Sequence, residues 1–160
     1  MQIRPYQSAD LPTLRAITVE GFTGVSIDHG MEQAFGLING HDWRWRKARH
    51  IDFDVAREAA GCFVAVDEEA EGGAAIAGYI TTWQDPAAGI GHIPNLAVHS
   101  AYRNRGLGRT LIEHALAHFR ASGLTHAKIE TLAQNAVGNH LYPALGFVEV
   151  ARQVHFLAKL

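Results

Sequence analysis

The stretch that most constrains this chain is the turn before its clearest helical pattern. Residues 95–119 read NLAVHSAYRNRGLGRTLIEHALAHF, in which an apolar run ends at Val98 and a turn with two arginines and two glycines follows. Apolar residues then recur with the spacing of one helix face, which predicts a helix over roughly 107–121 that ends at Ser122-Gly123. A strand, a tight turn and a helix in this order favour an α/β arrangement.

The same turn is suited to holding an anion. The first N–H groups of a helix have no partner within it, and the helix dipole adds partial positive charge there. Gly106 and Gly108 allow a ligand to approach the backbone, and Arg103 and Arg105 add charge, so the turn could hold a pyrophosphate. The spacing is neither that of a Walker A loop nor G-x-G-x-x-G, because Leu111 occupies the third glycine position. An ordinary turn with solvated arginines is the alternative.

The rest of the chain alternates strand-like and helical patterns without internal repeats or linkers. The strand-like runs are 1–6, 62–69, 74–84, 92–98, 126–134 and 147–160. The helical runs are 8–22, 31–38, 52–60, 107–121 and 135–146. We therefore expect residues 1–160 to form one α/β domain with a central, mixed, twisted sheet of about six to seven strands and helices on both faces.

Composition excludes several classes of protein. The net charge of −2 argues against a dedicated nucleic-acid binder, and no apolar run approaches the length of a membrane span. Cys62 is the single cysteine, so an internal disulfide is impossible, and we expect a buried thiol in a cytoplasmic protein. Ten histidines are scattered; His114 and His118 have metal-ligand spacing but no third ligand, so we expect surface residues and no metal.

Two motifs resemble those of the GNAT superfamily of N-acetyltransferases. The first is the apolar strand that ends in Leu96-Ala97-Val98, followed by Arg103-Asn104-Arg105-Gly106-Leu107-Gly108 at the start of a helix. The second is Asn135 followed by HLYPALGF, which contains Tyr142, Gly146 and Phe147. The order of the elements also matches this family, with residues 23–58 the weakest part of the match.

The resemblance implies acetyl-CoA as co-substrate. Its pyrophosphate would lie on the backbone amides of the glycine turn, and its pantetheine arm would pair with the strand as a neighbouring strand does. The N–H of Leu96 would polarise the thioester carbonyl. The residues implied in cofactor binding are Leu96, Ala97, Val98, Arg103, Asn104, Arg105, Gly106, Leu107, Gly108, Arg109 and Asn135.

The implied reaction is direct attack of an amine on the thioester, which needs an acid for the leaving thiolate. Tyr142 is the candidate acid, and packing of the helix against the sheet is its alternative role. His92 and Glu130 are both candidates for the general base, since family members carry proton acceptors at these positions. Positioning of the substrates without a base is the third possibility. A protein that binds acyl-CoA without turnover is the alternative function.

Residues 42–50, DWRWRKARH, mix tryptophans with basic residues. The pattern could bind single-stranded nucleic acid, but we favour an amphipathic segment with Trp43 or Trp45 in the core and solvated charges. In this family the region helps to form the acceptor pocket, so Trp43, Arg44, Arg46 or Arg49 could bind an acidic group of the acceptor. The acceptor itself, a small-molecule amine, a peptide N-terminus or a lysine, is left open.

The C-terminus departs from the family pattern. Many members end in a strand–loop–strand hairpin, whereas only fourteen residues follow Gly146 here. One long strand, a tight hairpin or an edge completed by a second subunit would each fit this length. An uncovered edge strand invites pairing, which favours a homodimer.

Overall fold

The computed structural model of the protein describes all residues from Met1 to Leu160 and contains one mixed sheet. Its five strands follow the order of the chain, and only the β4–β5 pair is parallel. The strands are β1 (Gln2–Pro5), β2 (Cys62–Asp67), β3 (Ala75–Asp85), β4 (Ile90–Val98) and β5 (His126–Ile129). The α/β class is confirmed, but the sheet has five strands, fewer than the expected six to seven.

Five α-helices connect these strands. They are α1 (Leu11–Gly21), α2 (Ile27–Phe35), α3 (Trp43–Glu58), α4 (Leu107–Ala121) and α5 (Ala136–Leu141). The predicted bounds of α4 are confirmed. The predicted helical run over 52–60 begins too late, because α3 begins at Trp43, where the Asp42 side chain accepts the N–H of Trp45 at 2.8 Å.

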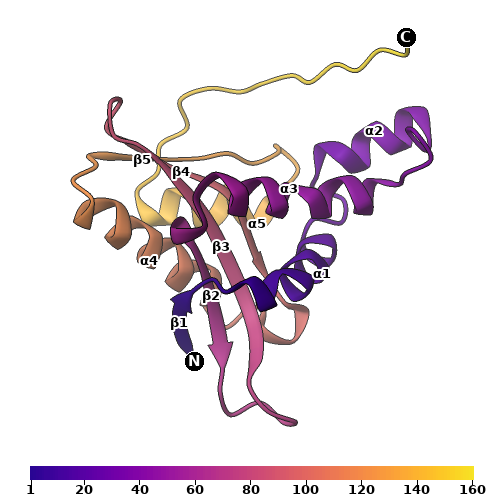
Figure 1. The fold of residues 1–160 in the computed structure, drawn as a ribbon. Helices are drawn as coiled ribbons and strands as arrows, with labels where there is room; N and C mark the ends of the chain where they lie inside the picture. The colour runs from indigo at the N-terminus through magenta and orange to yellow at the C-terminus, as the bar shows by residue number, and fades with distance from the viewer.

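Side chains of alternate strand residues form two cores, one on each face of the sheet. Phe63, Ala65 and Ile80 pack with α4, whereas Val64, Val66 and Tyr79 pack with α1 and α3. Figure 1 shows α3 crossing one face of the sheet and α4 lying against the other. None of the helices is both long and apolar enough to span a membrane.

β4 is irregular at its centre, and this irregularity shapes the site. Thr81 lies opposite Asn95 and Trp83 opposite His92, so β4 carries one residue more than β3 between these pairs. Pro94, which cannot donate to a strand ladder, lies in this bulge. Pairing with β5 ends at Ile93, so the outer edge of β4 from residue 94 to 98 has no neighbouring strand.

The expected C-terminal strand is absent. Residues 148–160, which we call the C-terminal arm, have no regular secondary structure and extend away from the sheet (Figure 1). The apolar side chains of Val150 and Phe156 are 91% and 93% exposed. A two-residue alternation specifies a strand only where a partner strand supplies hydrogen bonds, and the arm has none.

Candidate functional site

The glycine turn presents free backbone donors at the start of α4. Asn104 and Gly106 have φ values of 60° and 79°, in the left-handed region, which turns the chain into the helix. The first helical bond is donated by Thr110 N–H to the Gly106 carbonyl at 3.1 Å, and the N–H groups of residues 107–109 have no backbone partner. No atom lies within 4 Å of the place where a Cβ of Gly106 would stand, so the turn is open to a ligand.

Three exposed arginines surround this turn. Arg103 Nε donates to the Val98 carbonyl at 3.1 Å, which fastens the turn to the end of β4. Arg109 lies 3.7 Å from Glu113, and the Arg105 guanidinium lies 5.6 Å from the Tyr102 ring centroid. These surface contacts are weak, so an anion at the turn could compete for the guanidinium groups.

The outer edge of β4 offers a second free donor. His99 N–H donates to the Ala77 carbonyl on β3 at 2.9 Å. Because successive strand residues direct their N–H groups to opposite sides, those of Ala97 and Asn95 also face β3, and that of Leu96 faces the gap between β4 and β5. Leu96 and Val98 are half-buried beside the α4 core. The gap therefore has an apolar wall and an N–H donor.

α5 places Tyr142 beside the same core. The Asn135 Oδ1 caps α5 by accepting the Gly138 N–H at 3.2 Å, and its Nδ2 donates to Thr131 Oγ1 at 2.8 Å. A Cβ on Gly138 would lie 3.0 Å from the Tyr142 ring, so a larger residue there would displace the ring. Burial raises the pKa of Tyr142, with Thr131 opposing, so its phenol stays protonated at neutral pH.

The two sequence motifs meet in space. A Cβ on Gly108, in the first turn of α4, would lie 3.6 Å from the side chain of Leu141, the residue before Tyr142. Leu96, Leu141 and Tyr142 also pack against one core cluster. The glycine turn, the open edge of β4 and α5 thus belong to one region.

The two candidate bases differ in environment. His92 stacks on Trp83 with ring centroids 3.8 Å apart, and burial, followed by the charge of Lys128, lowers its pKa. It is therefore neutral at pH 7 and can accept a proton. Glu130 is exposed and pairs with Lys128 Nζ at 2.6 Å, just beyond the last paired residue of β5.

We expected the charges of residues 42–50 to be solvated, and this is only partly so. Trp43 is buried, as predicted for one tryptophan, but Arg46 is also largely covered and lies 3.5 Å from Asp28 and 4.0 Å from Glu32. These partners occupy Arg46, so it is a poor candidate for an acceptor's acidic group. Arg44 and Arg49 are exposed and lie over the Trp43 and Trp45 rings, where a ligand could reach them.

Sequence reasoning missed a buried polar cluster beneath α3. Lys47, only 6% exposed, donates from Nζ to Asn95 Oδ1 at 2.7 Å, and Asn95 Nδ2 donates to Asp54 Oδ2 at 2.6 Å. The signal was present: Trp43, Lys47 and Ile51 recur at four-residue spacing, so Lys47 lies on the buried stripe of the helix.

His114, His118 and Cys62 have structural environments. Both histidines are half-buried and meet the Phe63 ring, with centroids 4.5 and 5.1 Å away, so they are not fully exposed surface residues as expected. They face the sheet because α4 covers that side of Phe63. Burial raises the pKa of Cys62 to about 12, which keeps its thiol neutral. No three His, Cys, Asp or Glu side chains are arranged so that they could hold a metal ion.

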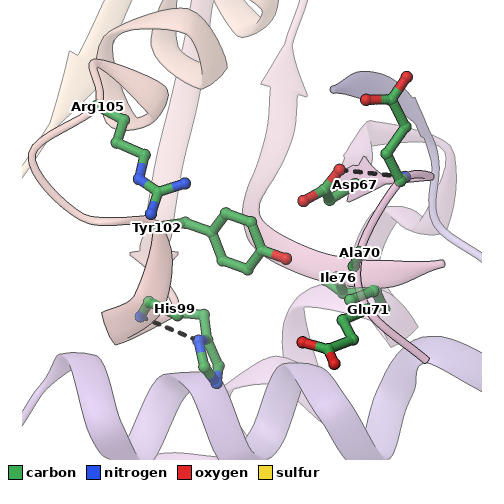
Figure 2. A pocket seen from close by; sticks show the side chains of 10 residues that line it. Asp67, Ala70, Glu71, Ile76, His99, Tyr102 and Arg105 are labelled. Carbon is green, nitrogen blue, oxygen red and sulfur yellow. Dashed lines mark hydrogen bonds between the residues drawn. The ribbon is translucent and has the colours of Figure 1, made fainter. Parts of the chain in front are cut away.

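A cavity adjoins the glycine turn, between the β2–β3 turn and residues 99–105. It has a volume of about 480 Å³, and Asp67, Glu69 and Glu71 contribute to its lining. Figure 2 shows the Tyr102 ring reaching toward Asp67 across this cavity. Arg105 also lines the cavity, but three carboxylates would repel a pyrophosphate, so the free N–H groups at the start of α4 are the better anion site.

Comparison with known proteins agrees with this geometry. Residues 26–147 match the model of the acetyltransferase (GNAT) family, which is more than half of the chain. The chain therefore belongs to the GNAT acetyltransferase family.

Curated relatives match over shorter segments. N-alpha-acetyltransferase 30 of Saccharomyces cerevisiae is 28% identical over 97 residues, 59% of this chain and 55% of that protein. The ribosomal protein bS18-alanine N-acetyltransferase of Escherichia coli is 40% identical over 55 residues, 34% of this chain and 37% of that protein. Mycothiol acetyltransferase of Tsukamurella paurometabola is 32% identical over 104 residues, which are 62% of this chain and 35% of that protein. The chain thus spans 35–55% of the length of these relatives.

Solved structures share the fold over nearly the whole chain. The NatC complex bound to Gag peptide and CoA contains a chain with a TM-score of 0.70 and 19% identity, covering 95% of this chain and 88% of that one. PaiA N-acetyltransferase from Thermoplasma acidophilum, in complex with coenzyme A, has a TM-score of 0.68 and 18% identity, and the match covers 90% of this chain and 87% of that one. At these identities the likeness concerns the fold.

Proposed function

We propose that residues 1–160 form one acetyltransferase domain that moves the acetyl group of acetyl-CoA directly to a primary amine. The observation that carries the proposal is the open outer edge of β4, where the Leu96 N–H faces a gap whose end lies at the glycine turn. Membership of the GNAT family and the activities named for the curated relatives support it.

The residues present suit acetyl-CoA. The free N–H groups of residues 107–109 and the charge of Arg103, Arg105 and Arg109 would hold the pyrophosphate. The pantetheine arm would add along Leu96–Val98, where a strand neighbour is missing. Asn135 keeps one amide hydrogen beyond its bond to Thr131, which is free for a cofactor carbonyl.

The proposed reaction requires three groups. The neutral amine attacks the thioester carbon, and the carbonyl oxygen takes up negative charge that the Leu96 N–H stabilises. The C–S bond then breaks, and the thiolate takes the proton of the Tyr142 phenol. A base removes one proton from the amine nitrogen.

His92 and Glu130 remain the candidates for that base. If His92 acts, its lowered pKa puts the acid limb of kcat/KM below the usual histidine range. That limb should disappear in His92→Gln and persist in Glu130→Gln. The opposite result would assign the role to Glu130, and an unchanged limb in both variants would leave positioning as the source of the rate.

The acceptor class we propose is a primary amine of a small molecule or of a peptide, either its N-terminus or a lysine. Two relatives are named for N-terminal acetylation and a third for mycothiol. Arg44 and Arg49 are exposed on α3 and would bind an acidic group of such an acceptor.

The C-terminal arm supports a homodimer in which it pairs with the free edge of β5 in a second copy. β5 is an edge strand of four residues, and the arm exposes apolar side chains that a strand partner would cover. Light scattering should give twice the chain mass for the full chain and the chain mass after truncation at Phe147. A full chain that is monomeric at high concentration would refute this pairing.

The first test is thermal unfolding with acetyl-CoA, followed by thiol release with a panel of amines. Ligand at about 100 times its Kd should stabilise the fold by about 2.7 kcal/mol, a rise of several degrees in Tm. Stabilisation together with amine-dependent thiol release supports the enzyme. Stabilisation without turnover on any amine would favour an acyl-CoA-binding protein, and no stabilisation would refute both.

A further inference from the structure

One helix holds both ends of a single amide side chain on β4. Lys47 and Asp54 are seven residues apart on α3, two turns, so they lie on the same face. Lys47 Nζ donates to Asn95 Oδ1 at 2.7 Å, and Asn95 Nδ2 donates to Asp54 Oδ2 at 2.6 Å. The side chain of Asn95, 4% exposed, is therefore fixed at both polar atoms.

Thr81 on β3 fixes the backbone of the same residue. Its Oγ1 lies 2.7 Å from Asp54 Oδ2, 3.1 Å from the Asn95 nitrogen and 3.4 Å from the Asn95 carbonyl oxygen. A hydroxyl has one proton, and the short contact to a carboxylate takes it. Thr81 therefore donates to Asp54 and accepts the Asn95 N–H. Asn95 is thus held at three atoms, its Oδ1, its Nδ2 and its backbone nitrogen.

The peptide that follows is the one that carries the Leu96 N–H. In a planar trans peptide the carbonyl of Asn95 and the N–H of Leu96 point in opposite directions. The carbonyl lies on the β3 side, near Thr81, so the N–H is directed into the gap between β4 and β5. The direction of this donor thus depends on how firmly Asn95 is held.

We propose that Lys47, Asp54 and Thr81 are positioning residues that orient the Asn95–Leu96 peptide, so that the Leu96 N–H meets the thioester carbonyl. This inference rests on the proposed acetyltransferase function. The three side chains touch neither the thioester nor the amine and act through Asn95. The bulge at Pro94 makes such support necessary, because β4 there lacks β5 and loses its regular register with β3.

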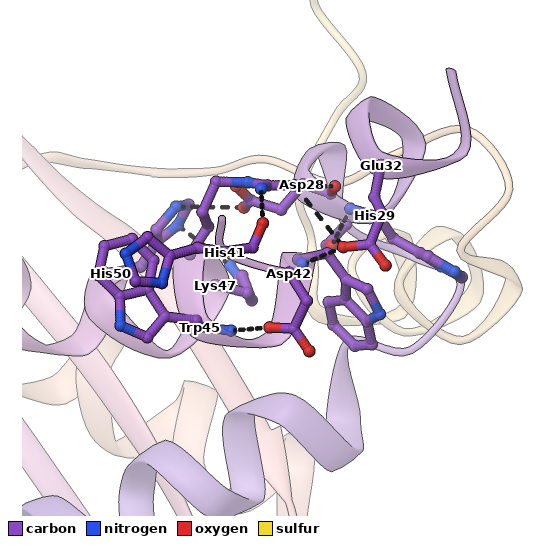
Figure 3. A network of polar contacts seen from close by, with 11 residues as sticks. Asp28, His29, Glu32, His41, Asp42, Trp45, Lys47 and His50 are labelled. Atoms are coloured by element: carbon purple, nitrogen blue, oxygen red, sulfur yellow. Dashed lines mark hydrogen bonds and ion pairs between the residues drawn. The ribbon is translucent and has the colours of Figure 1, made fainter. Parts of the chain in front are cut away.

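The core does not require these polar groups. Lys47 lies between Trp43 and Ile51 on the buried stripe of α3, where a methionine would fill the space without an ion to desolvate. Its ammonium lies 3.8 Å from the centroid of the Phe22 ring and 3.4 Å from His50 Nδ1. Figure 3 shows the wider polar network of α2 and α3, in which His50 in turn meets Asp28 at 3.2 Å. A retained buried charge of this kind points to a role in positioning rather than in stability.

The test compares Thr81→Val with Thr82→Val. Thr82 is the adjacent residue, 1% exposed, and its hydroxyl donates to the Gly61 carbonyl at 2.7 Å, away from Asn95. Both variants lose one buried hydroxyl and keep the side-chain shape, but Thr81→Val leaves two polar partners unpaired and Thr82→Val leaves one, so Tm is measured for both. We expect kcat to fall at least about tenfold in Thr81→Val, with the Kd for CoA unchanged within about twofold, and to stay near wild type in Thr82→Val.

A spectroscopic readout separates orientation from stability. The infrared carbonyl stretch of bound, ¹³C-labelled acetyl-CoA should shift to lower frequency in the wild type and in Thr82→Val, and the shift should shrink in Thr81→Val. Lys47→Met, which leaves Thr81 intact, should show the same loss, and it replaces Thr81→Val in the test if that variant folds poorly. Equal kcat and equal shifts in all variants, with an active wild type, would overturn this inference alone. A wild type that neither binds nor transfers acetyl groups would overturn the proposed function and this inference with it.

Discussion

The two long helices on opposite faces of the sheet bury different chemistry. Every side chain that α4 buries is apolar, namely Leu107, Leu111, Ile112, Ala115 and Phe119. α3 buries Trp43 and Ile51 but also Lys47, and it directs Asp54 at Thr81 and Asn95. We infer that the α4 face supplies stability, whereas the α3 face gives up some stability to control the geometry of β4.

The largest expected effect tests the α4 side of this comparison. Phe119 is buried and packs on Gly91, where a Cβ would lie 2.5 Å from the ring. Phe119→Ala should lower the free energy of unfolding by about 3–5 kcal/mol, because it removes apolar contacts and leaves a cavity. Urea unfolding measures this loss, and the folded fraction should keep the kcat of the wild type.

Ile112→Val provides a milder substitution on the same face, with an expected loss of about 1 kcal/mol. Should either variant lose kcat in proportion to its loss of stability, α4 would also control the chemistry, and the division between the two faces would be wrong.

The same contrast explains how far the sequence could predict the structure. The bounds of α4 were predictable because a glycine turn, an apolar stripe and Ser122-Gly123 are local signals. The first half of α3 was missed because WRWR alternates in polarity. The buried stripe of this helix also includes a charged residue, Lys47, so it does not look apolar in the sequence. The C-terminal arm was predicted as a strand from its alternation, but pairing depends on a partner that local sequence does not encode.

The candidate site divides in the same way. The glycine turn and Tyr142 follow from two motifs of the sequence, and the structure brings the regions that carry them together. The cluster of Lys47, Asp54 and Asn95 joins residues up to 48 positions apart, so only tertiary structure brings it together.

The next expected effect concerns the proposed chemistry itself. Tyr142→Phe removes the proton proposed for the leaving thiolate and keeps the ring that packs against Phe147. We expect kcat to fall about a hundredfold or more, equivalent to about 2.7 kcal/mol, with little change in Tm or in the Kd for CoA. Steady-state thiol release and thermal unfolding measure the two quantities. Normal turnover in this variant would show that Tyr142 only packs.

The last expected effect concerns the cost of burying Lys47. Burial lowers the pKa of Lys47 from 10.5 to about 8, and the nearby charges of Asp28 and Asp54 oppose the shift. Below pH 8 the lysine is protonated in both the folded and the unfolded chain, so its contribution does not vary with pH. Between pH 8 and 10.5 the unfolded chain binds more protons, so stability rises with pH.

The free energy of unfolding of the wild type should therefore rise relative to that of Lys47→Met between pH 7 and 9.5. The interval from pH 8 to 9.5 corresponds to about 2 kcal/mol. Urea unfolding of both proteins at the two pH values isolates Lys47, because the other titrating groups, including Asp28, His50 and Asp54, are shared. Parallel pH profiles would mean that Lys47 keeps its ordinary pKa and is solvated, and α3 would then bury no charge that α4 lacks. A rise in the stability of the wild type relative to Lys47→Met would show that burying the Lys47 charge destabilises the fold at neutral pH. The fold would tolerate this cost if Lys47 has a positioning role.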